Sequence, residues 1–213
     1  PEQAASHPLR WRAQELAAGA LWHLAAVGDN KQTMVNAGAI PPLVAELSSQ
    51  SDMAREYAAG VLSALARTQG GNKKAIVAAG GIEPLIALLS DPAIDTQKNA
   101  ACALWGLTEG KEGIYDKQVV EKGAVEPLIA MLMMNHPESR GFAAACLSCC
   151  CADENAQKAI RETGSDALRA LALSPNTWLR QQVTEMLRLL DLPLPDPDQI
   201  SSLASMPMMD ADW

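Results

Sequence analysis

Apolar residues in this chain fall into helix-sized blocks that return about every 42 residues. One block reads AAGALWHLA, AAGVLSALA, AACALWGLT, AAACLSCCC and VTEMLRLLD in its successive copies. The same place in every copy holds a leucine: Leu21, Leu62, Leu104, Leu147 and Leu187. Alanine and leucine dominate these blocks, which favours close-packed helices over strands. A repeat of this length predicts a stack of helical units, each burying its apolar face against its neighbours.

A second phrase keeps the same period and subdivides each unit. It reads NKQTMVNAGAIPPLVAELS, NKKAIVAAGGIEPLIALLS and YDKQVVEKGAVEPLIAMLM, with a more diverged fourth copy, NAQKAIRETGSDALRALAL. We expect a short first helix that opens at Asn30 or Asn72 and ends at a glycine: Gly38, Gly80, Gly123 and Gly164. Prolines then stand in the first turn of a second helix, where no N–H is needed. The apolar block forms a longer third helix.

Counting these phrases predicts a single continuous solenoid over residues 1–190. It comprises a partial repeat and four whole ones, with approximate bounds 8–27, 29–67, 71–109, 114–152 and 154–190. The last unit lacks the proline, and Arg169 and Arg188 interrupt its apolar stripes, as is typical of a terminal cap. Residues 191–213 form an acidic tail with four prolines, five aspartates and no basic residue, a composition that cannot build a core.

Charge and cysteine content narrow the class of protein further. With 17 basic and 25 acidic residues, the net charge of −8 argues against binding nucleic acid through its phosphates. No apolar run approaches the roughly 20 residues that span a bilayer, and no secretory leader is visible. Because the chain lacks an initiator Met, we expect it to begin inside a longer protein or after processing. Its five cysteines, four of them clustered at residues 146–151, fit buried free thiols in a reducing compartment, the cytoplasm or alternatively the nucleus.

The phrase GAIPPLVAEL followed by AAGVLSALA, together with the Asn-Lys opening of the first helix, resembles the armadillo repeat. The resemblance covers nearly all of residues 10–190. It implies an all-α, right-handed solenoid of three-helix repeats whose third helices line a concave groove. It also implies protein binding without catalysis and without a cofactor.

The best-understood peptide-binding members of that family hold extended chains with two ladders of third-helix residues, asparagines and tryptophans. At the asparagine positions this chain has His23, Ala64, Gly106, Cys149 and Leu189. At the tryptophan positions it has Gly19, Gly60, Cys102, Ala145 and Glu185. Both ladders are missing, so we do not expect it to bind basic nuclear-import peptides.

Other third-helix residues are the candidates for partner binding. Tyr57, Asn99 and Phe142 lie one helical turn before the missing tryptophans, and the two aromatic rings would be anchors. The alternative is that both rings pack inside their own units. Trp22 and Trp105 occupy equivalent positions, at the groove rim or in the core, and His23 could bind a peptide carbonyl.

Two further features leave alternatives open. Cys146, Cys149 and Cys150 share one helix face, but without a second CxxC pair we expect apolar packing and no metal, with zinc or redox sensing as the weaker alternative.

The tail would dock on its own solenoid or on a neighbouring copy through the apolar side chains of Met208, Met209 and Trp213. The tail would otherwise be a motif for another protein, or a loose end.

The sequence therefore predicts a non-catalytic adaptor or scaffold that holds a protein or peptide segment on its third helices, with no nucleic acid and no membrane insertion. Two alternatives remain: the substrate-recognition part of a larger enzyme such as an E3 ubiquitin ligase, or a structural subunit of a large assembly.

Overall fold

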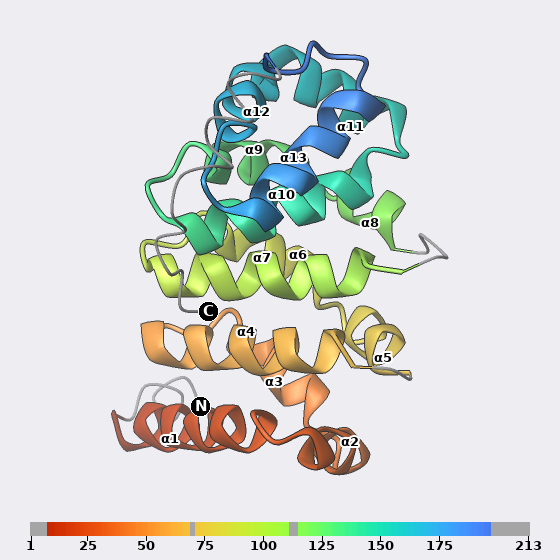
Figure 1. The fold of residues 1–213 in the computed structure, drawn as a ribbon. Helices are drawn as coiled ribbons and strands as arrows, with labels where there is room; N and C mark the ends of the chain where they lie inside the picture. Colours follow the sequence, from red (N-terminus) through yellow and green to blue (C-terminus); the bar gives the residue numbers. More distant parts are fainter. Residues whose placement is uncertain (1–7, 69–70, 111–114, 197–213) are drawn as a thin grey trace. The chain divides into compact units, whose positions relative to one another are not determined.

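A computed structural model of the chain describes residues 8–68, 71–110 and 115–196. The chain forms two compact units, Pro1–Glu109 and Gly110–Trp213. Every regular element of the described residues is a helix (Figure 1). Met208, Met209 and Trp213 lie outside the described residues, so the docking of the tail remains a prediction.

Unit 1 contains one lone helix followed by two three-helix sets. The lone helix is α1 (Pro8–Ala25). The first set is α2 (Gly28–Asn36), α3 (Ile40–Glu46) and α4 (Asp52–Ala66), and the second is α5 (Asn72–Ala78), α6 (Ile82–Leu88) and α7 (Ile94–Thr108). The long helices α1, α4 and α7 pack side by side, with α3 against α4 and α6 against α7 (Figure 1). This is the predicted arrangement, with α1 as the third helix of a partial repeat.

Unit 2 contains two more sets. The first is α8 (Asp116–Glu121), α9 (Val125–Leu132) and α10 (Pro137–Cys150). The second is α11 (Glu154–Ala159), a short π-helix η2 (Ile160–Gly164), α12 (Ser165–Leu171) and α13 (Thr177–Leu189). Within the unit α10 packs on α9 and α13, and α12 packs on α13. None of the helices in the described ranges combines the length and the apolar content that a membrane crossing requires.

Glycines set the turn between the first and second helices. Gly38, Gly80 and Gly123 have φ of 77°, 78° and 84°, a left-handed conformation that suits a residue without Cβ. After Gly38 the Ala39 N–H donates to the Met34 carbonyl, 3.1 Å away, which closes the Schellman motif expected at such a helix end.

Two details of the predicted pattern are wrong. Gly164 has φ −103°, and η2 carries the chain from α11 into α12 without a left-handed turn. This copy has no proline after its glycine, so nothing prevents the helical backbone from continuing. The second error concerns Asn30: α2 begins two residues earlier, at Gly28, and the Asn30 side chain donates to the Leu24 carbonyl (3.1 Å).

The core of each unit is built mainly of leucine, alanine and other aliphatic side chains from the second and third helices. Of the marker leucines, Leu62, Leu104, Leu147 and Leu187 are fully buried, whereas Leu21 in the lone helix α1 is half-buried. A further repeat feature, not predicted, joins the second helix to the third. One side chain in each third helix donates to the backbone carbonyl six residues earlier: Arg55 to Ser49, Gln97 to Asp91, Arg140 to Met134, and Arg180 to Ser174. We call these four residues the loop clamp.

Candidate protein-binding surface

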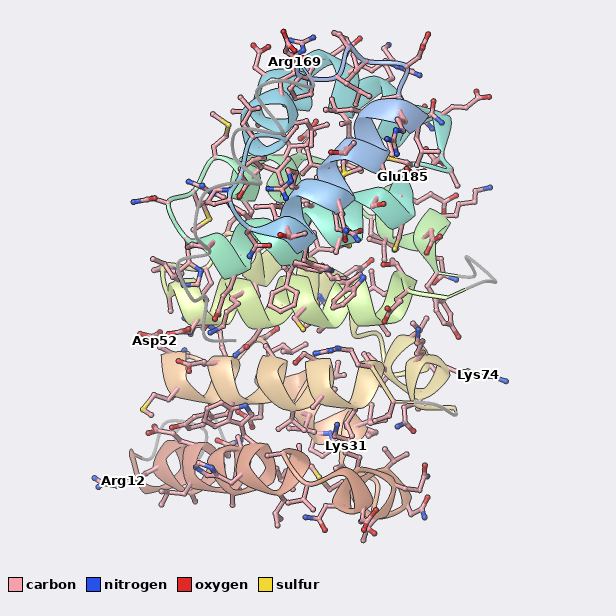
Figure 2. All side chains as sticks on the ribbon, viewed as in Figure 1. Arg12, Lys31, Asp52, Lys74, Arg169 and Glu185 are labelled. Atoms are coloured by element: carbon pink, nitrogen blue, oxygen red, sulfur yellow. The ribbon has the colours of Figure 1, made fainter. Side chains whose placement is uncertain are left out.

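The third helices of unit 1 bring together most of the residues that the sequence singled out. We define the third-helix face of unit 1 as the following side chains and glycines of α1, α4 and α7, together with Arg67 directly after α4: Gly19, Trp22, His23, Tyr57, Gly60, Ser63, Arg67, Asn99, Cys102, Trp105 and Gly106. Figure 2 shows the side chains on these stacked helices.

An aromatic stack lies across α1 and α4. The ring centroids of Trp22 and Tyr57 are 5.4 Å apart with the planes at 27°. Trp22 is 39% exposed, while Tyr57 is half-buried. The sequence proposed Trp22 and Tyr57 as separate candidates for partner binding. In the structure the two rings form one stacked pair with an edge that faces solvent.

Two glycines make room for this stack. A Cβ on Gly19 would lie 3.1 Å from the Tyr57 ring, and a Cβ on Gly60 would lie 2.8 Å from the Trp22 indole nitrogen. The Gly60 distance is shorter than real Cβ atoms show and the Gly19 distance is unusually short, so the rings occupy the space that side chains at these two ladder positions would fill. Glycine at these two positions therefore leaves room for the stack.

Asn99 lies on the same face, next to Gly60. Its amide donates to the Glu56 carbonyl, 3.3 Å away on α4, so it ties α7 to α4. Burial raises the pKa of the Glu56 side chain, the nearby Asp95 raises it further, and Lys98 opposes both effects. The sequence proposed Asn99 as a groove residue, and the structure gives it a half-buried position with one hydrogen bond inside the unit.

Trp105 and Arg67 form a second cluster, at the C-terminal end of α4. The Arg67 guanidinium carbon is 5.3 Å from the centroid of the Trp105 ring, a cation–π arrangement. Arg67 is exposed and Trp105 is half-buried. The thiol of Cys102 lies within hydrogen-bonding reach of Ser63 and Arg67, but burial dominates and raises its pKa.

His23 is exposed on α1, with its ring centroid 5.3 Å from that of Trp22 and the planes tilted by 48°. A histidine in this place can donate to or accept from a bound peptide group.

Unit 2 has an aromatic pair of its own. Phe142 on α10 meets Trp178 on α13 edge-on, at 6.2 Å and 68°. A Cβ on Gly141 would lie 2.5 Å from the Trp178 ring, so this glycine too provides space for an aromatic neighbour. Both rings are half-buried. Sequence reasoning proposed Phe142 but overlooked Trp178, whose signal would have been a tryptophan in the first turn of the last third helix.

The cysteines of unit 2 pack as small apolar residues. Cys146, Cys150 and Cys151 are buried and Cys149 is half-buried, and all are free thiols. The hydrogen bond that the Cys150 thiol makes to Cys146, together with burial, raises the pKa of Cys150, and burial raises that of Cys151 to about 12. Within the three described ranges, no three His, Cys, Asp or Glu side chains are placed to hold a metal ion.

The fold and this face define a helical-repeat protein with aromatic anchors on its third helices. Residues 29–67 and 71–109 match the model of the Armadillo/beta-catenin-like repeat. A designed armadillo repeat protein matches with a TM-score of 0.74 at 26% identity, covering 83% of this chain and 75% of the other. An engineered protein matches with a TM-score of 0.73 at 30% identity, covering 85% and 75%.

Computationally designed armadillo repeat proteins made for modular peptide recognition also match, with a TM-score of 0.72 at 25% identity, covering 82% and 74%. A comparison with curated proteins gave no match. The chain belongs to the armadillo repeat family. Proteins with this repeat are typically non-catalytic binding scaffolds, and its all-helical repeat fold is the one predicted from the sequence.

Proposed function

We propose that this chain is a non-catalytic adaptor or scaffold that holds a segment of a partner protein on the third-helix face of unit 1. The observation that carries the proposal is the stack of Trp22 on Tyr57, which leaves 39% of Trp22 exposed. Aromatic side chains held in place by packed helices are the groups on which interface energy usually concentrates.

The structural relatives support a peptide or protein segment as the occupant. Designed armadillo proteins made for modular peptide recognition share the fold at 25% identity. The chemistry of this face differs from the Asn and Trp ladders, because Gly19 and Gly60 stand at two of the tryptophan positions and neighbouring rings fill their space. We therefore propose that an apolar side chain of the partner inserts beside Trp22, and that backbone clamping contributes less. Four of the five cysteines are buried free thiols, which fits a location in the cytoplasm or nucleus.

A random peptide library displayed on phage tests the proposal when it is selected against the full chain. We expect enriched peptides with an aromatic or large aliphatic residue, and at least tenfold weaker binding to the Trp22→Ala and Tyr57→Ala variants, measured by fluorescence anisotropy. Met133→Ala is the matched control, because Met133 is 70% exposed and belongs to unit 2. If nothing is enriched, or if the selected peptides bind all variants equally, the proposed function is wrong.

A further inference from the structure

We propose that Arg67 binds an acidic side chain of the partner segment, so that the third-helix face of unit 1 selects segments that combine an apolar residue with an Asp or Glu. This inference rests on the proposed function and specifies the chemistry of the partner. It concerns a residue that the sequence pattern did not single out.

Contacts with α7 restrain the Arg67 side chain, which is exposed to solvent. Its guanidinium lies over the Trp105 ring, 5.3 Å from the centroid. Its stem passes over Gly106, where an added Cβ would lie 3.0 Å from the Arg67 Cγ. A guanidinium has five N–H donors, so those of Arg67 that do not face the Cys102 thiol can make two parallel hydrogen bonds to a carboxylate. A preoriented arginine loses less side-chain entropy when it binds.

Arg67 also lacks a counter-charge in the part of the chain that the structure describes. Arg55, at the opposite end of α4, contacts the carboxylates of both Asp52 and Asp91 at 2.7 Å. Among the described residues, no such ion pair forms at Arg67. The thiol beside it, that of Cys102, is kept protonated by burial and brings no negative charge. Because the guanidinium remains charged at every physiological pH, its position favours an anion supplied by a partner.

The charges of unit 1 are segregated along α4 in a way that suits this proposal. Near the starts of α4 and α7, the three carboxylates of Asp52, Glu56 and Asp95 outnumber the two basic side chains of Arg55 and Lys98. At the other end of α4, Arg67 is followed closely by Lys73 and Lys74 in α5. Lys73 donates to the backbone carbonyl of Glu109, which holds one ammonium near the end of α7. An acidic residue of the partner would therefore be attracted to the Arg67 end, despite the negative charge of the whole chain.

The two clusters set a spacing for the partner. Tyr57 and Arg67 are ten residues apart along α4 and its end, or about 15 Å at the rise of an α-helix. An extended peptide advances about 3.3 Å per residue, so its apolar and acidic residues should stand about four or five positions apart.

The test is the same peptide library selected in parallel against the full-length wild type, Arg67→Gln and Arg12→Gln. Arg12 is an exposed arginine on α1 and is the matched control. We expect the wild type and Arg12→Gln to enrich Asp or Glu about four or five positions from an apolar residue. Arg67→Gln should keep the apolar preference and lose the acidic one. For a selected peptide, amidated at its C-terminus, changing the acidic residue to its amide should weaken binding to the wild type about fivefold and to Arg67→Gln less than twofold.

The outcomes separate the two proposals. If the wild type enriches no peptide, the proposed function fails. If the enriched peptides depend on Trp22 and Tyr57 but carry no acidic residue, or if Arg67→Gln retains the acidic preference, the role of Arg67 is wrong while the proposed function stands. Arg67→Lys keeps the charge but not the planar fork, so an affinity as high as that of the wild type would refute the stacked, two-bond geometry. Equal thermal midpoints of all variants confirm that folding is unchanged.

Discussion

Gly60→Ala tests the packing on which the proposed binding face depends. In most helix interiors this change is favourable, because alanine stabilises a helix by about 0.5–1 kcal/mol relative to glycine. At Gly60 the new Cβ would lie 2.8 Å from the Trp22 indole nitrogen, 2.9 Å from Trp22 Cδ1 and 3.3 Å from the Asn99 amide nitrogen. The indole must therefore move.

The magnitude follows from what Trp22 loses when it moves. Its stack on Tyr57 is worth about 0.5–1.5 kcal/mol beyond the area that it buries. Because Trp22 is already 39% exposed, the ring can swing outward without disrupting the core. The gain in helix propensity and the loss of the stack then nearly cancel, so the free energy of unfolding should change by less than about 1 kcal/mol. Peptide binding should nevertheless fall as far as it does in Trp22→Ala.

Urea denaturation measures the stability, and near-ultraviolet circular dichroism reports the coupling of the two rings. Gly28→Ala is the control, because a Cβ there meets nothing within 4 Å, and it should stabilise the protein by about 0.4–1 kcal/mol with an unchanged spectrum. In the double variant Trp22→Ala/Gly60→Ala, the new Cβ no longer meets an indole ring. The double variant should therefore be more stable than Trp22→Ala alone, by the gain in helix propensity. The reasoning is refuted if Gly60→Ala stabilises as much as Gly28→Ala and leaves both the spectrum and peptide binding intact.

Two further predictions concern buried polar groups. Asp91→Ala should lower the free energy of unfolding by about 2–4 kcal/mol, because its side chain is only 5% exposed and its loss leaves Arg55 partly unpaired. The exposed partner of the same arginine gives the control: Asp52→Ala should cost less than about 1 kcal/mol in the same urea titration, and equal losses would contradict this ranking. Burial raises the pKa of Cys151 from 9.0 to about 12, so the folded state holds this proton more tightly than the unfolded state. Stability should therefore fall as pH rises from about 9 to 12, and less steeply in Cys151→Ala; identical pH profiles would exclude this contribution.

Much of the fold could be predicted because the repeat encodes it in residues with strong backbone preferences. Gly38, Gly80 and Gly123 adopt the left-handed turn that a glycine before a proline-containing helix implies. Gly164 shows the limit of that inference, because a glycine permits a left-handed turn without requiring one. In its copy the proline is absent and the chain remains helical.

The binding face was less predictable because it depends on where side chains point across helices. Tyr57 and Trp22 were both proposed from their repeat positions, but their mutual stacking depends on the ring orientations that the repeat does not specify. Arg67 lies just beyond the repeated block, so the comparison of the repeat copies indicated no role for it. The loop clamp could have been found from the sequence, because its residues keep the spacing of the repeat: Arg55, Gln97, Arg140 and Arg180. It was missed because one of the four is a glutamine and not an arginine.

Five glycines of unit 1 fall into two physical classes, and the division indicates how an armadillo chain could bind as proposed without the family ladders. The turn glycines Gly38 and Gly80 have positive φ, and an added Cβ would meet nothing within 4 Å, so the backbone alone requires glycine there. The ladder glycines have helical backbones that any residue could adopt, and a Cβ on each would press against a neighbouring side chain: Gly19 on Tyr57, Gly60 on Trp22, and Gly106 on Ala66 and Arg67. At these three ladder positions a group from the adjacent helix or its end thus takes the place of the missing side chain. The surface that results is aromatic at one end and cationic at the other, and the proposed partner segment would have to match both ends.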